Sequence, residues 1–180
     1  RKLPLVLGLG WFTVSLGLMG LAPNYAMLVV LGLLAGIGSS FYHPLATTIL
    51  AAQFHERRGW ALGIHGSGGS VGMFITPIVF GIMGTVWGWR QAFHMVLIPG
   101  LIVTILVWML VKEPKIKTET VSLLKTLRMM TKPLIVMTLI FSISNMSFQG
   151  VITFLPTYFV NERGASVALA GILSSIMLFM

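Results

Sequence analysis

The chain of 180 residues is 56% hydrophobic and 9% charged, with a mean hydropathy of +0.94, which is unlike the composition of a soluble domain. It has no cysteine, which excludes disulfides, thiolate metal sites and a cysteine nucleophile. The net charge of +8 would suggest a nucleic-acid partner for a soluble protein, but here the basic residues lie between apolar runs. We therefore expect a lipid bilayer as the surrounding partner, and no nucleic acid.

Six apolar runs predict membrane-spanning helices, at residues 4–22, 26–52, 61–86, 91–111, 133–160 and 167–180. A helix rises about 1.5 Å per residue and needs about 20 residues to cross a hydrocarbon core, so the first five runs are long enough. Lipid accepts only helices or closed barrels, and the runs lack the alternation of barrel strands. The predicted fold is an all-α, polytopic membrane helix bundle. Because the chain begins at Arg1 and ends inside the sixth run, we expect it to be a fragment.

Basic residues alternate between the two sides of these predicted helices. They precede the first run and gather in residues 52–60 and 112–132, whereas residues 23–25, 87–90 and 161–166 carry little net charge. The positive-inside rule places the basic segments in the cytoplasm, which predicts a multi-pass protein of the cytoplasmic (inner) membrane. Segment 112–132 carries Val121, Leu124, Leu127 and Met130 at helical spacing. It is interpreted either as an amphipathic surface helix or as a mobile linker.

His43 lies inside the second run, on the cytoplasmic side of its midpoint. An ionisable side chain at that depth is costly and suggests a function, either as a substrate contact or as a proton site. The structural alternative is a neutral histidine that binds a backbone carbonyl left without a partner by Pro44. His65, in the third run, lies nearer the inner boundary and is a weaker candidate for the same substrate or proton site.

The third run is rich in glycine, and Gly68, Gly72, Pro77 and Gly81 recur along it. We expect these residues to serve in helix packing and gating, because missing side chains let two helices approach closely. Gly171 and Ser175 of the sixth run suit the same kind of crossing.

The segment Gly68-Gly69-Ser70-Val71-Gly72 also matches the G-x-S-x-G pattern of serine hydrolases. A nucleophilic serine needs a histidine within hydrogen-bond reach, and His94 lies roughly 15 Å away in depth. His43 lies at a similar depth to Ser70, but the chain has no aspartate, and all four glutamates lie between the runs. An intramembrane serine hydrolase is therefore kept only as the alternative, and the expected answer is that the protein is not an enzyme.

A polar stripe runs along the fifth apolar run. Its members share one helical face and can form hydrogen bonds, and they are Ser142, Asn145, Gln149 and Thr153. In lipid such a stripe must face protein or water. It is interpreted either as hydrogen-bonding contact between helices or as the wall of a polar cavity.

Three segments carry a family resemblance. Trp89-Arg90-Gln91-Ala92-Phe93 resembles the W-R-x-x-F element that major facilitator transporters carry between their fifth and sixth helices. The glycine-rich third run is similar to the family's fifth helix, with Thr76 in place of the glycine that precedes the proline in antiporters. Segment 36–44, Gly-Ile-Gly-Ser-Ser-Phe-Tyr-His-Pro, is similar to the fourth helix of fosmidomycin-resistance-type exporters, although Gly32 stands where many family members place an arginine.

The resemblance implies that the chain covers the third to eighth of twelve helices. Residues 1–111 would then hold four helices of the N-terminal bundle, 112–132 the central cytoplasmic loop, and 133–180 the first two helices of the C-terminal bundle. The family's seventh helix lines the central cavity, which favours the cavity-wall interpretation of the polar stripe. The resemblance also implies that the third and sixth runs meet between the two bundles.

The predicted function is secondary active transport of a small solute across the membrane by alternating access, without a metal or other cofactor. His43, Asn145 and Gln149 are the expected substrate contacts. Their chemistry suits a neutral or amphipathic solute, or an anion met by protonated His43, and a coupling ion is a further expected partner. A channel and a non-transporting membrane sensor stay open as alternatives.

Overall fold

The computed structural model describes residues 1–113 and 131–179, and this part of the chain is helical between short turns, with no strand. Its helices are α1 (Lys2–Met19), α2 (Tyr25–Ser40), α3 (Tyr42–Gln53), the 3-10 turn η1 (His55–Arg57), α4 (Arg58–Trp87), α5 (Trp89–Leu110), α7 (Lys132–Arg163) and α8 (Val167–Phe179). Within the described residues, five helical stretches are long and apolar enough to cross a membrane, and α8 is shorter. The prediction of an all-α membrane bundle is confirmed.

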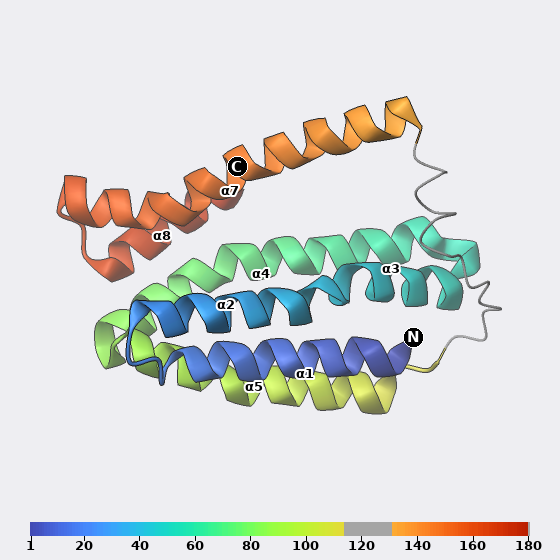
Figure 1. Cartoon of the computed structure of the whole chain (residues 1–180), viewed down its shortest axis with the longest axis horizontal. Helices are drawn as coiled ribbons and strands as arrows, with labels where there is room; N and C mark the ends of the chain where they lie inside the picture. The colour runs from blue at the N-terminus through green and yellow to red at the C-terminus, as the bar shows by residue number, and fades with distance from the viewer. Residues whose placement is uncertain (114–130, 180) are drawn as a thin grey trace.

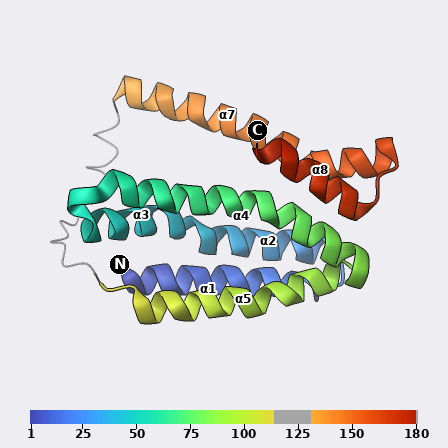
Figure 2. The same ribbon diagram turned by 180° about the vertical axis from the view of Figure 1, so that it is seen from behind.

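The helices lie roughly parallel in two groups (Figures 1 and 2). Helix α1 packs against α2 and α5, while α4 packs against α5 on one side and α8 on the other. Helices α7 and α8 form a hairpin, and the first half of α7 lies away from the other helices in both views. Arg1, η1 and residues 111–113 lie together at one end of the molecule, which we call the basic end. The connections α1–α2, α4–α5 and α7–α8 lie at the opposite end.

The second predicted span is not one helix, because α2 ends at Ser40 and α3 begins at Tyr42. Pro44 has no N–H to donate to the carbonyl of Ser40, so the hydrogen-bond ladder is interrupted there. The hydroxyls of Ser39 and Ser40 bond back to the carbonyls of Gly36 and Ile37, at 3.0 Å and 2.7 Å, a pattern that bends helices. The break leaves Tyr42 and His43 at the start of a new helix in the middle of the span.

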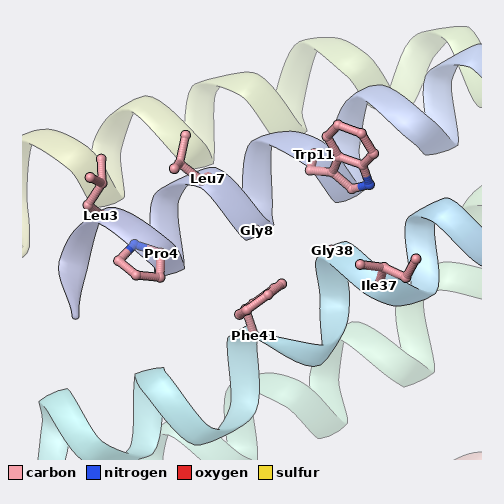
Figure 3. A pocket seen from close by; sticks show the side chains of 8 residues that line it. All are labelled: Leu3, Pro4, Leu7, Gly8, Trp11, Ile37, Gly38 and Phe41. Carbon is pink, nitrogen blue, oxygen red and sulfur yellow. The ribbon is translucent and has the colours of Figure 1, made fainter.

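Helices α1 and α2 cross where two glycines face each other. A Cβ atom on Gly38 would lie 2.8 Å from the carbonyl oxygen of Gly8, so neither position has room for a side chain. Beside the crossing lies an apolar hollow of about 300 Å³, into which Phe41 points from below Gly38 (Figure 3). The indole N–H of Trp11 donates to the carbonyl of Leu34 at 2.9 Å. The residues that line this hollow are apolar and offer a ligand few groups for hydrogen bonding.

At the basic end, contacts join the start of α1, the end of α3 and the residues after α5. The side-chain amide of Gln53 donates to the carbonyl of Lys112 at 2.9 Å. The carboxylate of Glu113 accepts a hydrogen bond from the backbone N–H of Lys2 at 2.8 Å.

Helix α5 ends at Leu110 and α7 begins at Lys132. Most of the predicted cytoplasmic segment 112–132, including its apolar spacing at Val121, Leu124, Leu127 and Met130, lies outside the described residues. The predicted division into 1–111, 112–132 and 133–180 therefore stays a prediction.

Candidate functional site

A hollow of about 530 Å³ lies between the start of α3 and the first half of α4. That volume falls within the range of ligand sites for small molecules. Two of the predicted site residues, His43 and His65, line it together. Its remaining wall is built by residues of α3 and α4, which are Tyr42, Ile64, Gly66, Gly68, Gly69, Ser70 and Met73.

Tyr42 lies between the two histidines. The centroid of its ring is 5.4 Å from that of His43, in an edge-on arrangement, and 5.6 Å from that of His65. We call these three residues the Tyr42 cluster. His43 lies about 15 Å from the end of α3 and His65 about 10 Å from the start of α4, at about 1.5 Å per residue, so both lie inside the apolar spans. Their burial differs, because His65 is half-buried and His43 is exposed to the hollow.

Sequence reasoning missed Tyr42, although a tyrosine hydroxyl within an apolar span was a signal that could have found it. Tyr42 and His43 also line a second hollow of about 330 Å³ on the side of α1, together with Leu9, Phe12 and Ser39. The two hollows share these residues because the start of α3 lies between α1 and α4.

The structural alternative for His43 is not observed. Among the described residues, the His43 imidazole makes no hydrogen bond to the carbonyl of Ser40, which is the one that Pro44 leaves without an N–H donor. Within residues 1–113 and 131–179, neither His43 nor His65 makes a side-chain hydrogen bond to protein. Both imidazoles therefore keep their nitrogen atoms for a solute or a proton.

The glycines in the first half of α4 have free space beside them, whereas Gly81 in its second half packs against α8. We call these the open half and the packed half of α4. A Cβ atom on Gly66, Gly68, Gly69 or Gly72 would meet nothing within 4 Å. The described helices therefore place no packing partner at Gly68 or Gly72, and the packing role of these two glycines stays a prediction. Gly66, Gly68 and Gly69 line the hollow, where their missing side chains leave space.

The packed half of α4 meets α8. A Cβ atom on Gly81 would lie 3.0 Å from the carbonyl oxygen of Val167, and one on Gly171 would overlap the carbonyl of Pro77. Ser175 is fully buried beside this crossing and donates its hydroxyl to the carbonyl of Gly171 at 2.9 Å. The structure thus brings Pro77, Gly81 and Gly171 together, while their role in gating stays a prediction.

Ser70 and His43 line the same hollow, but they are not paired as a nucleophile and its base. The hydroxyl of Ser70 donates to the carbonyl of Gly66 in its own helix at 3.3 Å. No third residue orients His43 toward it among the described residues, which also hold no group of three or more histidine, cysteine or acidic residues that could bind a metal. The geometry does not favour the hydrolase alternative.

The polar stripe of α7 lies on one continuous helix, and all four of its residues are exposed. Ser142 donates to the carbonyl of Thr138 at 2.8 Å and Asn145 to that of Phe141 at 2.9 Å, so both bonds stay within α7. Gln149 and Thr153 lie on the same face. The described residues do not bring this stripe into contact with the Tyr42 cluster, because α7 packs mainly against α8.

At the end opposite the basic end, the segment around Arg90 in α5 contacts the residues after α1 and the second half of α4. The guanidinium of Arg90 donates to the carbonyl of Ala22 after α1 at 3.1 Å, and it lies 4.2 Å from the centroid of the Trp89 ring. The Phe93 ring contacts Phe80 of α4 at 6.0 Å and Trp89 at 6.3 Å, both edge-on. Only Gly88, with φ of 82°, separates α4 from α5, so the predicted connection 87–90 is a single-residue turn.

Several known proteins resemble the chain. It is 26% identical over 189 residues to multidrug resistance protein MdtG of Enterobacter lignolyticus (strain SCF1), covering 98% of this chain and 44% of that protein. It is 27% identical over 191 residues to a hexuronate transporter of Bacillus subtilis (strain 168), covering 97% and 44%. It is 30% identical over 108 residues to MFS antiporter QDR3 of Candida albicans, covering 59% and 16%.

The chain thus spans less than half the length of these relatives, and no solved structure matches it. The more specific resemblance to fosmidomycin-resistance-type exporters is not tested by these relatives and stays a prediction. The sequence model of the Major Facilitator Superfamily matches residues 1–180. This match agrees with the family resemblance of the segment around Arg90 and of the glycine-rich α4. The chain belongs to the major facilitator superfamily.

Proposed function

We propose that the protein is a secondary active transporter that moves a small solute across the cytoplasmic membrane by alternating access. The family membership supports this proposal, and so do relatives named as a multidrug resistance protein, an antiporter and a hexuronate transporter. The observation that carries it is the hollow of about 530 Å³ at a helix break, with two histidines whose nitrogen atoms have no protein partner in the described residues. Discontinuous helices of this kind form the substrate sites of many transporters.

Helix α4 reaches from the candidate site to α8, so a movement at one place can be passed to the other. The first half of α4 lines the hollow and its second half crosses α8, so one continuous helix connects the candidate site to the contact between the two groups of helices. A rocking motion about the crossing of Gly81 and Gly171 would change access to the hollow. In this arrangement, residues 1–111 and 133–180 belong to two bundles, joined by a cytoplasmic connection at 112–132.

Two further parts of the proposal concern orientation and the opposite wall of the cavity. We place the basic end in the cytoplasm, because positively charged connections stay on that side of the membrane. We assign the exposed stripe Ser142, Asn145, Gln149 and Thr153 to the wall contributed by α7, since four hydrogen-bonding groups facing lipid would be costly.

The test is gradient-driven uptake by the full-length protein in liposomes, screened across solute classes, with His43→Gln and His43→Leu measured beside the native protein. His43→Gln should fold, because glutamine still forms hydrogen bonds, but it should lose substrate affinity or the pH dependence between about pH 5 and 8. If His43 were only structural, His43→Gln would transport normally and His43→Leu would lose thermal stability. Flux that does not saturate would contradict a transporter and indicate a channel.

A further inference from the structure

Among the residues that the structure describes, no acidic side chain lies at the depth of the Tyr42 cluster. The chain has no aspartate, and the glutamates in the described part lie at helix ends or beyond them: Glu56 in η1, Glu113 after α5, and Glu162 in the last turn of α7. The residues that line the hollow include no carboxylate. A cationic solute would therefore find no countercharge there, and burying an unpaired charge is expensive.

The same hollow is rich in groups that donate hydrogen bonds once protons are taken up. Each imidazole has two nitrogen atoms, both of which are donors when the ring is protonated, and Tyr42 adds a hydroxyl. Because Tyr42 lies between the two histidines, at 5.4 Å and 5.6 Å, a solute of the size of the hollow can contact both rings.

We propose that the Tyr42 cluster binds the acid group of an organic anion, and that His43 and His65 take up protons as it binds. The proposal rests on the transport function proposed above and adds the chemical class of its solute, a compound with a carboxylate or phosphate group. Two imidazolium rings supply the positive charge that desolvation of the anion requires. Tyr42 positions both rings and offers its hydroxyl to the acid oxygen atoms.

The other charged groups around the cluster lie farther along the helices that carry it. Arg58 begins α4 about two turns before His65, and η1 holds His55, Glu56 and Arg57 beyond it. Helix α1 carries Lys2 at its start, and α5 carries Arg90 and the titratable His94 near the end opposite the basic end. Helices α2 and α8 carry no charged residue or histidine. Proton uptake by His43 and His65 is therefore the titration expected to control anion binding.

The experiment measures binding and transport by the full-length protein with solutes matched in size but not in charge. Glucuronate, glucose 6-phosphate, glucose and glucosamine form one set, and benzoate, benzamide and benzylamine form another. Binding is measured as thermal stabilisation of the purified protein between pH 5.5 and 8, and uptake is measured in liposomes. Comparing glucuronate with glucose 6-phosphate distinguishes a carboxylate site from a phosphate site.

We expect at least one acid to bind, while its neutral and cationic counterparts do not. Carboxylates stay ionised above about pH 5, so the pH dependence of glucuronate and benzoate binding reports the protein, whereas the phosphate of glucose 6-phosphate itself titrates near pH 6. Carboxylate binding should weaken about tenfold or more between pH 6.5 and 8, where imidazole rings lose their protons. His43→Gln and His65→Gln should each flatten that dependence. His55→Gln, a control in η1 outside the hollow, should keep it.

The outcomes separate this proposal from the transport function. Uptake of glucose, glucosamine, benzamide or benzylamine without uptake of any acid would leave transport standing and overturn the anion site. Acid binding that is unchanged by pH and by both histidine substitutions would also overturn it. If no solute were bound or carried, both proposals would fail.

Discussion

Replacing Gly171 by alanine tests the crossing of α4 and α8, with Gly72→Ala as the matched control. The new methyl group of Gly171→Ala would overlap the backbone carbonyl of Pro77, which cannot rotate away as a side chain can. At Gly72 the same methyl group would meet nothing within 4 Å. Gly81→Ala is intermediate, because its methyl group would lie 3.0 Å from the carbonyl oxygen of Val167 and needs only a small shift.

The magnitude follows from two opposing effects. Alanine favours a helix over glycine by about 1 kcal/mol, and this gain is common to all three variants. Overpacking a tight contact costs about 1–3 kcal/mol, and it applies to Gly171 in full, to Gly81 in part and to Gly72 not at all. The predicted order of stability is therefore Gly72→Ala, Gly81→Ala, Gly171→Ala. The entropy of unfolding grows with chain length, and the relatives are more than twice as long as this chain, so each kcal/mol should shift the melting temperature by about 1 °C. The first and last variants should therefore differ in melting temperature by about 1–3 °C.

Thermal unfolding of the purified full-length variants in one detergent measures this order, and uptake assays show whether transport follows it. Because helix propensity is shared, the difference between Gly171→Ala and Gly72→Ala isolates the contact between α4 and α8. Equal melting temperatures, or a lower value for Gly72→Ala, would refute the arrangement of α4 against α8.

Two further predictions concern orientation and the segment around Arg90. A cysteine at Asn161 should react with an impermeant thiol reagent added outside and one at Arg58 only from inside, whereas the reverse labelling would invert the proposed orientation. Arg90→Ala should lower the free energy of unfolding by about 1.5–3 kcal/mol, because it removes a charged hydrogen bond to the carbonyl of Ala22. Arg90→Lys should retain part of that stability, and unchanged melting of Arg90→Ala would show that the bond contributes nothing.

The membrane-spanning helices can be predicted from the sequence, because each one depends only on the residues of its own apolar run. Lipid offers no partner for backbone N–H and C=O groups, so each long apolar run must bond internally as a helix, and its length is visible in the hydropathy. The segment around Arg90 is equally local, because its consecutive residues are enough to indicate the family. The histidines stand out because ionisable residues are rare in apolar runs.

Tertiary structure decides what those residues contact. The sequence of α4 shows evenly spaced glycines, but only the positions of α3 and α8 reveal that Gly68 and Gly72 face open space while Gly81 meets Gly171. The sequence places a tyrosine hydroxyl in an apolar span, but only the tertiary structure shows that the Tyr42 ring contacts both His43 and His65, which come from different helices.

The break at Phe41 shows the same division between local and tertiary information. Pro44 marks a weak point in the hydrogen-bond ladder, because the missing N–H is a property of the residue itself. The contacts around the break are tertiary, because α1 approaches α2 at Gly8 and Gly38 and α4 lies along α3. Sequence alone determines which backbone groups lack partners within their own helix, whereas the packing of distant helices determines which side chains share a cavity.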